Sequence, residues 1–216
     1  MKLIYPLISP YIINQGFGET FNEYYKLKGL LGHSGIDLFS KNKTVFSAHD
    51  GVVYSTLNKN NPDPMKYRAV YTIVNDGIDY YELVYGHLDT IYVNEGERIP
   101  TGVAIGKMGN TGTVYSGGRL ITKEEKLAGS TAGAHLHFQK RKLVRTQKDL
   151  RGHQYLIGSN GIIYRDKDSY CYLVPDFENG YNGCSDPKED FYTPTLLEKI
   201  KIVWGVLRYL QSKGRV

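Results

Sequence analysis

The chain has 216 residues, of which 41% are hydrophobic and 23% are charged. This is the composition of an ordinary globular protein, and the length suffices for one large domain with its own core. No apolar run approaches the ~20 residues that a membrane-spanning helix needs, so a helical integral membrane protein is excluded. The formal charge of +5 suits an acidic partner such as nucleic acid, a membrane or an anionic cell wall, but also a mildly basic surface without a dedicated partner.

The first residues resemble a secretory signal only superficially. Pro6 and Pro10 interrupt the apolar segment, and no A-x-A cleavage pattern follows. We therefore expect no signal peptide. The two cysteines, Cys171 and Cys184, lack C-x-x-C spacing, which argues against a cysteine zinc site. Sequence leaves open whether they form a disulfide or remain thiols.

The body of the chain reads as β-structure, because 24 Gly and 19 Tyr favour strands joined by many turns. Two strands are predicted within residues 45–57. Residues 67–75 and 80–87 flank Asp76-Gly77, which is a strong hairpin signal. Further short strands are predicted at 103–108 and within 155–174. The segment 113–132 is expected to be a long surface loop with one helical turn.

The last third of the chain changes in character. Residues 141–153 are basic, but no aromatic platform is interleaved there, so we predict a solvated face and no nucleic-acid partner. An amphipathic helix is predicted over 194–212, with Thr193 as its N-cap and Pro194 in the first turn. We expect this helix to pack on the rest of the domain, although a partner or membrane surface remains an alternative. Its apolar stripe has 4-3-4-3 spacing and consists of Leu196, Ile200, Val203, Leu207 and Leu210.

Three histidine motifs stand apart from this framework. His135 and His137 are two residues apart in a predicted strand; they therefore share one face, while Leu136 and Phe138 face a core. His33 precedes Asp37 by four residues in a segment that we place on a loop entering a strand. His87 ends the predicted hairpin. Each motif alone is a weak indication, since a strand histidine pair or an aspartate-capped turn is commonly structural.

Taken in order, the motifs resemble the lysostaphin/LytM-type zinc endopeptidases of peptidase family M23, which cleave peptide bonds in bacterial peptidoglycan. The resemblance covers roughly residues 16–140. It includes Gly-His-x-x-x-Asp, Tyr-Gly-His and His-x-His, with a glycine skeleton between them that ends in Gly109-Asn-Thr-Gly112. No H-E-x-x-H motif occurs, which excludes the thermolysin-like class of zinc peptidases.

The resemblance assigns a role to each matching position. It implies that His33, Asp37 and His137 are zinc ligands and that His87 and His135 are catalytic. Two imidazoles and one carboxylate leave an open coordination position on Zn²⁺, as a catalytic zinc site requires. A water molecule activated there is a usable nucleophile near neutral pH.

The resemblance also implies a mainly β fold, in which antiparallel β-sheets form a groove in a LytM-like β-sandwich. Two departures from the family pattern stand out. A long insertion at 114–130 separates the Thr-Gly turn from His135, and the chain after residue 140 is longer than in the simplest family members. We therefore expect a peptidase domain at 1–192 and a C-terminal α-helix at 193–216 packed on it.

The sequence thus predicts a zinc-dependent endopeptidase that acts on peptidoglycan stem peptides or cross-links. Its partner would be a cell-wall peptide, with no membrane contact and a monomeric state. Without a signal peptide, a protein made in the cytoplasm and acting on the wall suits a phage lysin or a virion-associated hydrolase. The alternatives are a non-catalytic module that binds the wall or activates other hydrolases, and a saccharide-binding module that uses the many tyrosines.

Overall fold

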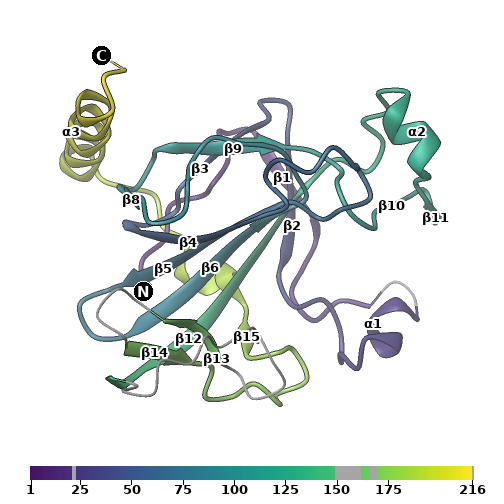
Figure 1. Cartoon of the computed structure of the whole chain (residues 1–216), viewed down its shortest axis with the longest axis horizontal. Coiled ribbons are helices and arrows are strands. Elements are labelled where there is room, and N and C mark those ends of the chain that lie inside the picture. The colour runs from purple at the N-terminus through teal and green to yellow at the C-terminus, as the bar shows by residue number, and fades with distance from the viewer. Residues whose placement is uncertain (21–22, 149–161, 166–169, 216) are drawn as a thin grey trace.

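The computed structural model describes residues 1–20, 23–148, 162–165 and 170–215. Its largest element is an antiparallel sheet that runs across the middle of the molecule (Figure 1). The fold is mainly β and antiparallel with a C-terminal helix, as predicted. In spatial order, the main path of the sheet contains β1 (Tyr11–Gln15), β2 (Ile36–Ser40), β12 (Leu136–Lys148), β6 (Tyr80–Gly86), β5 (Ala69–Asn75), β4 (Gly51–Leu57) and β8 (Arg98–Ile99).

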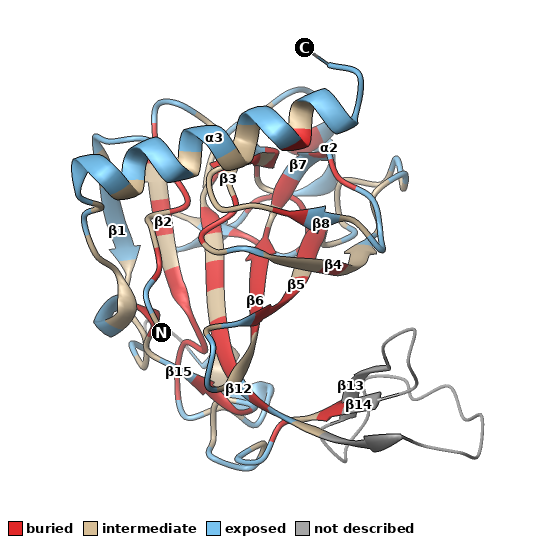
Figure 2. Cartoon of the chain, turned by 90° about the vertical axis from the view of Figure 1, so that its left-hand side faces the viewer, coloured by how far each residue is buried: buried red, intermediate tan, exposed pale blue. Residues whose placement is uncertain are grey.

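A smaller sheet provides the second layer of the core. It has the order β3 (Thr44–Phe46), β9 (Ala104–Met108) and β7 (Leu88–Ile91). Its side chains Val45 and Ile105 are fully buried in one cluster with Leu136 and Phe138 of β12. The predicted inward face of the histidine strand is thereby confirmed, and Figure 2 shows the buried residues concentrated in the strands of the main sheet.

The predicted hairpin at Asp76-Gly77 is present between β5 and β6. The Asp76 carboxylate accepts hydrogen bonds from the backbone N–H groups of Ile78 and Asp79, at 3.0 and 2.8 Å. These bonds satisfy turn amides that have no partner in the ladder. The strands predicted within 45–57 and at 103–108 are also found, as β3, β4 and β9.

The basic segment after residue 140 differs from its prediction. Strand β12 continues to Lys148 and pairs there with β14 (Tyr170–Leu173), which also pairs with β13 (Ile162–Arg165). Arg141 is 7% exposed and Leu143 2% exposed, so this part of 141–153 is not a solvated face. The charge of Arg141 is tolerated inside because it pairs with the buried Glu82. Residues 149–153 lie outside the described residues.

The chain then turns back along β12. Strand β15 (Cys184–Ser185) pairs with it and precedes a short 3₁₀ helix, η1 (Pro187–Asp190). Cys184 is a buried free thiol, and burial raises its pKa to about 12. The side chain of Cys171 lies outside the described residues.

The insertion contains more structure than the predicted loop. Besides the expected short helix, α2 (Lys123–Leu127), it forms a small hairpin of β10 (Tyr115–Ser116) and β11 (Arg119–Leu120). Thr122 and Glu125 form a capping box at the start of α2, which satisfies backbone N–H groups that have no partner within the helix. Lys126 reaches back and donates to the Gly112 carbonyl, so the insertion is tied to the turn from which it departs.

The C-terminal helix α3 (Leu196–Ser212) begins two residues later than predicted. Its N-cap is Thr195, whose hydroxyl accepts from the Glu198 amide at 3.3 Å, while the Glu198 carboxylate accepts from the Thr195 amide at 2.8 Å. The expected N-cap, Thr193, and Pro194 both precede the helix. The T-x-x-E capping box is present in the sequence and is the better signal.

The helix packs on the domain, but through a different face from the predicted stripe. Tyr209 is 7% exposed and donates to the Glu97 carboxylate at 2.7 Å, and Lys213 pairs with the same carboxylate at 3.2 Å. Ile202 lies over Gly102, where an added Cβ would come within 2.8 Å of it. Four members of the predicted stripe are instead exposed, namely Leu196, Ile200, Val203 and Leu207. Spacing reveals an apolar face but not which of two faces docks.

Deleting the chain after Tyr192 should lower the melting temperature by about 3–12 °C, because it removes the buried Tyr209 together with the packing of Ile202. Burial of one large side chain contributes roughly 1.5–3 kcal/mol, and each kcal/mol shifts the transition by about 2–4 °C at this chain length. Trp204→Gln, at a position that is 59% exposed, serves as the control and should leave the thermal transition unchanged. An unaltered transition in the truncated protein would contradict stabilising docking.

Candidate functional site

A cleft of about 920 Å³ opens at the ends of β2, β6 and β12. Helix α1 (Tyr24–Leu27) and the β10 hairpin of the insertion border it, and both lie on the same side of the molecule in Figure 1. All five residues that the sequence singled out line this cleft: His33, Asp37, His87, His135 and His137.

Strand pairing explains why residues so distant in sequence meet here. Strand β12 lies between β2 and β6, and in this register His137 is opposite Asp37 on one side and Gly86 on the other. His87 directly follows Gly86. The alternation of side chains along β12 places His135 on the same face as His137.

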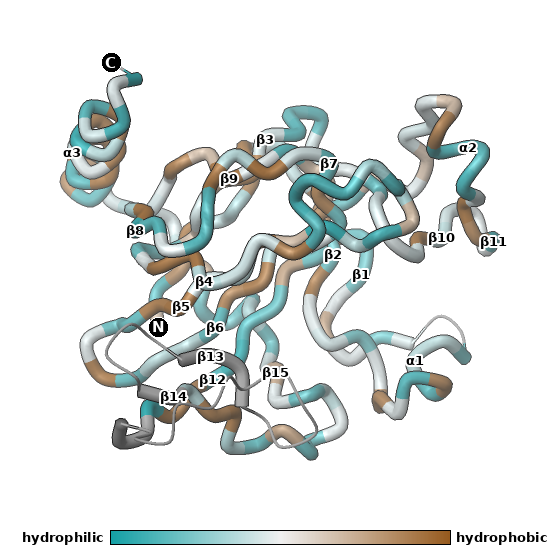
Figure 3. Tube along the Cα trace, viewed as in Figure 1, coloured by the Kyte–Doolittle hydropathy of each residue, from teal (hydrophilic) through white to brown (hydrophobic). Residues whose placement is uncertain are grey.

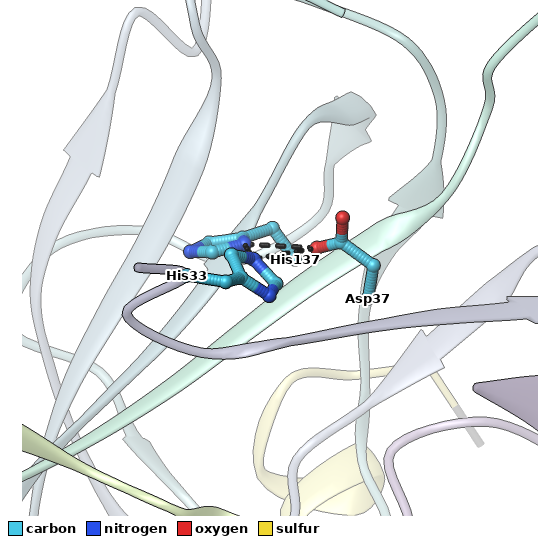
Figure 4. Close-up of side chains that lie close together, drawn as sticks. All are labelled: His33, Asp37 and His137. Carbon is cyan, nitrogen blue, oxygen red and sulfur yellow. Dashed lines mark hydrogen bonds and ion pairs between the residues drawn. The ribbon is translucent and has the colours of Figure 1, made fainter. Parts of the chain in front are cut away.

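The three predicted metal ligands converge (Figure 4). Asp37 Oδ1 is 2.9 Å from His137 Nδ1 and 3.2 Å from His33 Nε2. The two histidine nitrogens are 2.9 Å apart. Among the described residues, this is the group of histidine, cysteine and carboxylate side chains that is able to hold a metal ion.

Backbone carbonyls determine the tautomers of three rings. His33 Nδ1 lies 3.1 Å from the Gly16 carbonyl, His87 Nδ1 2.6 Å from that of Thr111, and His135 Nδ1 2.7 Å from that of Gly133. A carbonyl oxygen only accepts, so each Nδ1 carries the proton, and each neutral ring keeps its lone pair on Nε2. For His33, that lone pair points at Asp37 and His137.

Close contacts leave no space for a side chain at Gly35, and at Gly86 a side chain would displace Tyr67. A Cβ on Gly35 would lie 2.5 Å from the Phe138 carbonyl oxygen, so a side chain there would force β2 away from β12. A Cβ on Gly86 would lie 1.8 Å from Tyr67 Oη. His87 itself has a φ of 57°, a left-handed conformation that is uncommon outside glycine. This turn directs its ring into the cleft, where its centroid is 4.5 Å from that of His135.

The electrostatics of the site favour an ionised Asp37 carboxylate and neutral rings at His87 and His137. Burial raises the pKa of Asp37, but the charge of His135 and hydrogen bonds with His137 and His33 outweigh burial and hold this pKa well below its usual value. Burial lowers the pKa of His87 well below its usual value, and the neighbouring His135 and His137 lower it further. Burial likewise lowers the pKa of His137.

This donor set fits a divalent metal such as zinc. With neutral rings, the only proton among the three converging atoms is the one on His137 Nδ1, and a cation would take its place. Ligand atoms on a tetrahedral zinc lie roughly 3.4 Å apart, since each is ~2.1 Å from the metal. The observed separations of 2.9–3.2 Å require only a slight outward movement. His33 is in addition oriented from behind by the Gly16 carbonyl, as is usual for metal-binding histidines.

Two residues that contact His87 escaped sequence reasoning. Tyr67 lines the cleft with its ring edge-on to His87 at 4.8 Å, and Thr111 orients His87. Thr111 lies in the Gly109–Gly112 turn, which sequence reading treated only as part of a glycine skeleton. Tyr67 lies two residues before β5, at the start of the segment 67–75 that was predicted as a strand, and nothing in the sequence marked it as a cleft residue. Tyr67 comes close to His87 because residue 86 is a glycine, which leaves space for the tyrosine hydroxyl.

The insertion forms one wall of the cleft. Residues of its first part line the cleft, including Val114, Tyr115 and Gly117, and Tyr115 is 6.2 Å from Tyr24 of α1 in an edge contact. Asn110 holds the far end of the insertion through hydrogen bonds to the carbonyls of Ser130 and Ala132. Both ends of the insertion are therefore fixed beside the histidines.

The fold and the site together define a class of protein, a β scaffold that carries a candidate metal site in an open cleft. The sequence model of Peptidase family M23 matches residues 31–150, more than half of the chain. The chain therefore belongs to peptidase family M23, the family that the sequence motifs resemble.

Individual relatives are more distant. The peptidoglycan DD-endopeptidase ShyA of Vibrio cholerae is 29% identical over 136 residues, which are 62% of this chain and 26% of that protein. This chain thus spans about a quarter of the length of that relative. A zinc-containing peptidase from Vibrio cholerae is 25% identical, with 66% of this chain and 37% of the other covered and a TM-score of 0.44. The catalytic domain of lysostaphin from Staphylococcus simulans is 25% identical, with 61% and 80% covered and a TM-score of 0.40.

Proposed function

We propose that the protein is a zinc-dependent endopeptidase that hydrolyses peptide bonds in the stem peptides or cross-links of bacterial peptidoglycan. The observation that carries this proposal is the convergence of His33, Asp37 and His137 on one point beside two further histidines in an open cleft. Membership of family M23 and the similarity to a peptidoglycan DD-endopeptidase supply the class of substrate.

The proposed ligands leave one coordination position on the metal open for a water molecule or the substrate. Two imidazoles and one carboxylate occupy three positions of a four-coordinate site and leave one open. When bound, zinc would polarise a scissile carbonyl and lower the pKa of a water molecule towards ~7. The ionised state of Asp37 is favoured by its neighbours, so this ligand carries the negative charge that a divalent cation requires.

His87 and His135 would assist the proton transfer from the attacking water during hydrolysis. Each donates its Nδ1 proton to a backbone carbonyl, so each presents the lone pair of Nε2. His135 Nε2 lies 3.4 Å from Asp37 Oδ2, next to the proposed ligands. We assign it to accept the proton of the attacking water and to pass it to the leaving amine. His87, whose pKa is lowered by burial, would be neutral and would orient the attacking water by accepting a hydrogen bond from it at Nε2.

The competing function is a non-catalytic module that binds the wall or activates another hydrolase. The intact set of five residues in one cleft favours catalysis. The deciding experiment measures zinc content of the purified protein and the products released from defined muropeptides by mass spectrometry. Cleavage that is lost with a chelator and restored by Zn²⁺ supports the proposal. Binding to the wall that survives chelation, without any cleavage product, would establish the alternative.

Replacing residues 115–129 by a short Ser-Gly link should change relative rates on different muropeptides by about tenfold, because this segment walls the cleft. A tenfold change corresponds to about 1.4 kcal/mol of transition-state discrimination. Tyr115→Ala should reproduce part of the change. Tyr92→Ala is the matched control, since Tyr92 is 40% exposed against 45% for Tyr115 and is not among the residues lining the cleft. Unchanged relative rates in both cleft variants would remove the insertion from specificity.

We further propose that the enzyme acts on the wall after release or delivery by a phage, as a lysin or a virion component. This proposal takes up the sequence-based expectation of a phage lysin or a virion-associated hydrolase. Immunoblotting of purified virions and of lysates from the host would test it. A cellular source whose walls contain the protein in the absence of any phage would contradict it.

A further inference from the structure

One face of α3 is apolar and exposed, and we call it the outer face of α3. Trp204 is 59% exposed and Val203 55% exposed, although both belong to a folded helix. Contiguous exposed apolar residues of this extent indicate a binding surface. The outer face consists of Leu196, Leu197, Ile200, Val203, Trp204 and Leu207, all of which are at least 38% exposed.

The orientation of this face is fixed by the opposite side of the helix. Tyr209 is buried and hydrogen-bonded to Glu97, and Ile202 contacts Gly102. Successive residues are rotated by ~100° around a helix, so the outer face points away from this docked side. Figure 2 shows α3 lying across one side of the domain with long exposed stretches along its length. Its alternation of hydrophobic and hydrophilic positions is visible in Figure 3.

Positive charges border the outer face on both sides. Lys199 lies on one flank, and Lys201 and Arg208 lie on the other at the ~100° spacing of a helix; all three are exposed. The one acidic residue of α3, Glu198, is engaged in the capping box. The arrangement is an apolar band of Trp204 and aliphatic residues with one cation on one flank and two on the other.

We propose that the outer face of α3 docks on an anionic lipid surface, with α3 lying in the plane of the interface. Amphipathic helices of this composition bury their apolar face at the headgroup boundary, and their cations attract anionic lipids. This proposal is opposite to the sequence-based expectation of no membrane contact. It is also independent of the zinc chemistry.

The three cations that flank the outer face of α3 argue against other binding partners for this face. A second copy of the chain would bring cationic flank against cationic flank, whether the two helices ran parallel or antiparallel. A soluble polyanion would satisfy the cations but leave Trp204 and its apolar neighbours in water. None of the helices in the described ranges is long and apolar enough to cross a membrane, so the contact we propose is peripheral.

The position of α3 fits this role. In Figure 1, α3 lies at one end of the long axis, whereas α1 and the insertion, which border the cleft, lie at the other. A molecule held on a lipid surface through α3 therefore directs its cleft away from that surface.

Trp204 gives a direct test because it is the single tryptophan of the chain. The full chain is titrated with vesicles of phosphatidylglycerol and phosphatidylcholine, and with vesicles of phosphatidylcholine alone. We expect a blue shift of the emission and loss of acrylamide quenching with the anionic vesicles, at least tenfold weaker binding to the neutral ones, and release at high salt.

Two sets of variants separate the apolar and charged contributions. Val203→Gln with Leu207→Gln keeps the fluorophore and should weaken binding at least tenfold; Leu27→Gln with Ile78→Gln, at sites 83% and 88% exposed elsewhere, should not. Neutralising the three flanking cations to Gln should weaken binding roughly a hundredfold, about fivefold for each charge. The matched control replaces three exposed lysines elsewhere, Lys26, Lys41 and Lys66.

Three results would overturn the proposal. The first is the absence of any emission change with anionic vesicles. The second is equal binding by the Val203/Leu207 variant and the wild type. The third is a blue shift without vesicles that tracks dimerisation in sedimentation equilibrium, which would assign the outer face to a second copy. Circular dichroism of every variant, which should match the wild type, shows that lost binding does not arise from unfolding.

Discussion

His137→Ala is expected to abolish both zinc binding and hydrolysis, whereas His135→Ala should retain zinc and lose hydrolysis. The two side chains share one face of β12, but their surroundings differ. His137 Nδ1 lies 2.9 Å from both Asp37 Oδ1 and His33 Nε2, so its removal deletes one of the three proposed ligands. His135 directs its Nδ1 to the Gly133 carbonyl and stands beside the ligands. Loss of a general acid–base group typically slows a reaction by ~10²–10⁴-fold.

The measurement is metal content by mass spectrometry together with hydrolysis of a defined muropeptide. We expect close to one zinc per chain in the wild type and in His135→Ala, and almost none in His137→Ala. His49→Ala is the matched control, because that ring hydrogen-bonds the Asp50 carbonyl and does not line the cleft. Normal activity in His135→Ala, or full zinc occupancy in His137→Ala, would contradict the assignment of His135 as the acid–base group and His137 as a zinc ligand.

The largest effect on stability is expected from Glu82→Gln. Glu82 is fully buried and pairs with Arg141, which is 7% exposed, and it also accepts a hydrogen bond from Tyr54. Arg141 lies on the same face of β12 as His137, further along the strand. Leaving one partner of a buried ion pair uncompensated costs about 3–5 kcal/mol. At about 2–4 °C per kcal/mol, the melting temperature should fall by roughly 6–20 °C.

An adjacent ion pair supplies the control. Lys142, the next residue of β12, pairs with Asp79 at 2.8 Å, but the side chains are 51% and 35% exposed. Exposed pairs contribute only about 0–1 kcal/mol, so Lys142→Gln should shift the transition little. Adding Arg141→Met to Glu82→Gln should recover most of the loss, because no unpaired charge then remains and the introduced amide can still accept from Tyr54. Equal transitions for Glu82→Gln and Lys142→Gln would contradict the burial argument.

Much of the site was accessible from sequence because its residues obey local rules. His135 and His137 share a face since side chains alternate along a strand. The Asp76-Gly77 turn predicted the β5–β6 hairpin, and that hairpin carries His87 at its end. The order of the three histidine motifs then predicted the family, which the match over residues 31–150 confirms.

Other features depended on contacts between distant segments. The register that places His137 opposite Asp37 and Gly86 is a long-range pairing, and no local pattern specifies it. The burial of Arg141 follows from Glu82 on a neighbouring strand, although the surrounding sequence reads as a basic, solvated stretch. Tyr67 reaches the cleft only because Gly86 leaves space for its hydroxyl.

The C-terminal helix shows most clearly which features the sequence determined and which only the tertiary structure decided. Sequence determined that a helix forms there, since Thr195 and Glu198 cap it and its apolar residues follow a helical period. Only the tertiary structure decided which face docks. A hydrogen bond from Tyr209 to Glu97, 112 residues away in sequence, fixes the inner face, and the more apolar stripe is left exposed. Periodicity records how side chains are distributed around a helix axis, whereas docking depends on the surface that the rest of the chain presents to it.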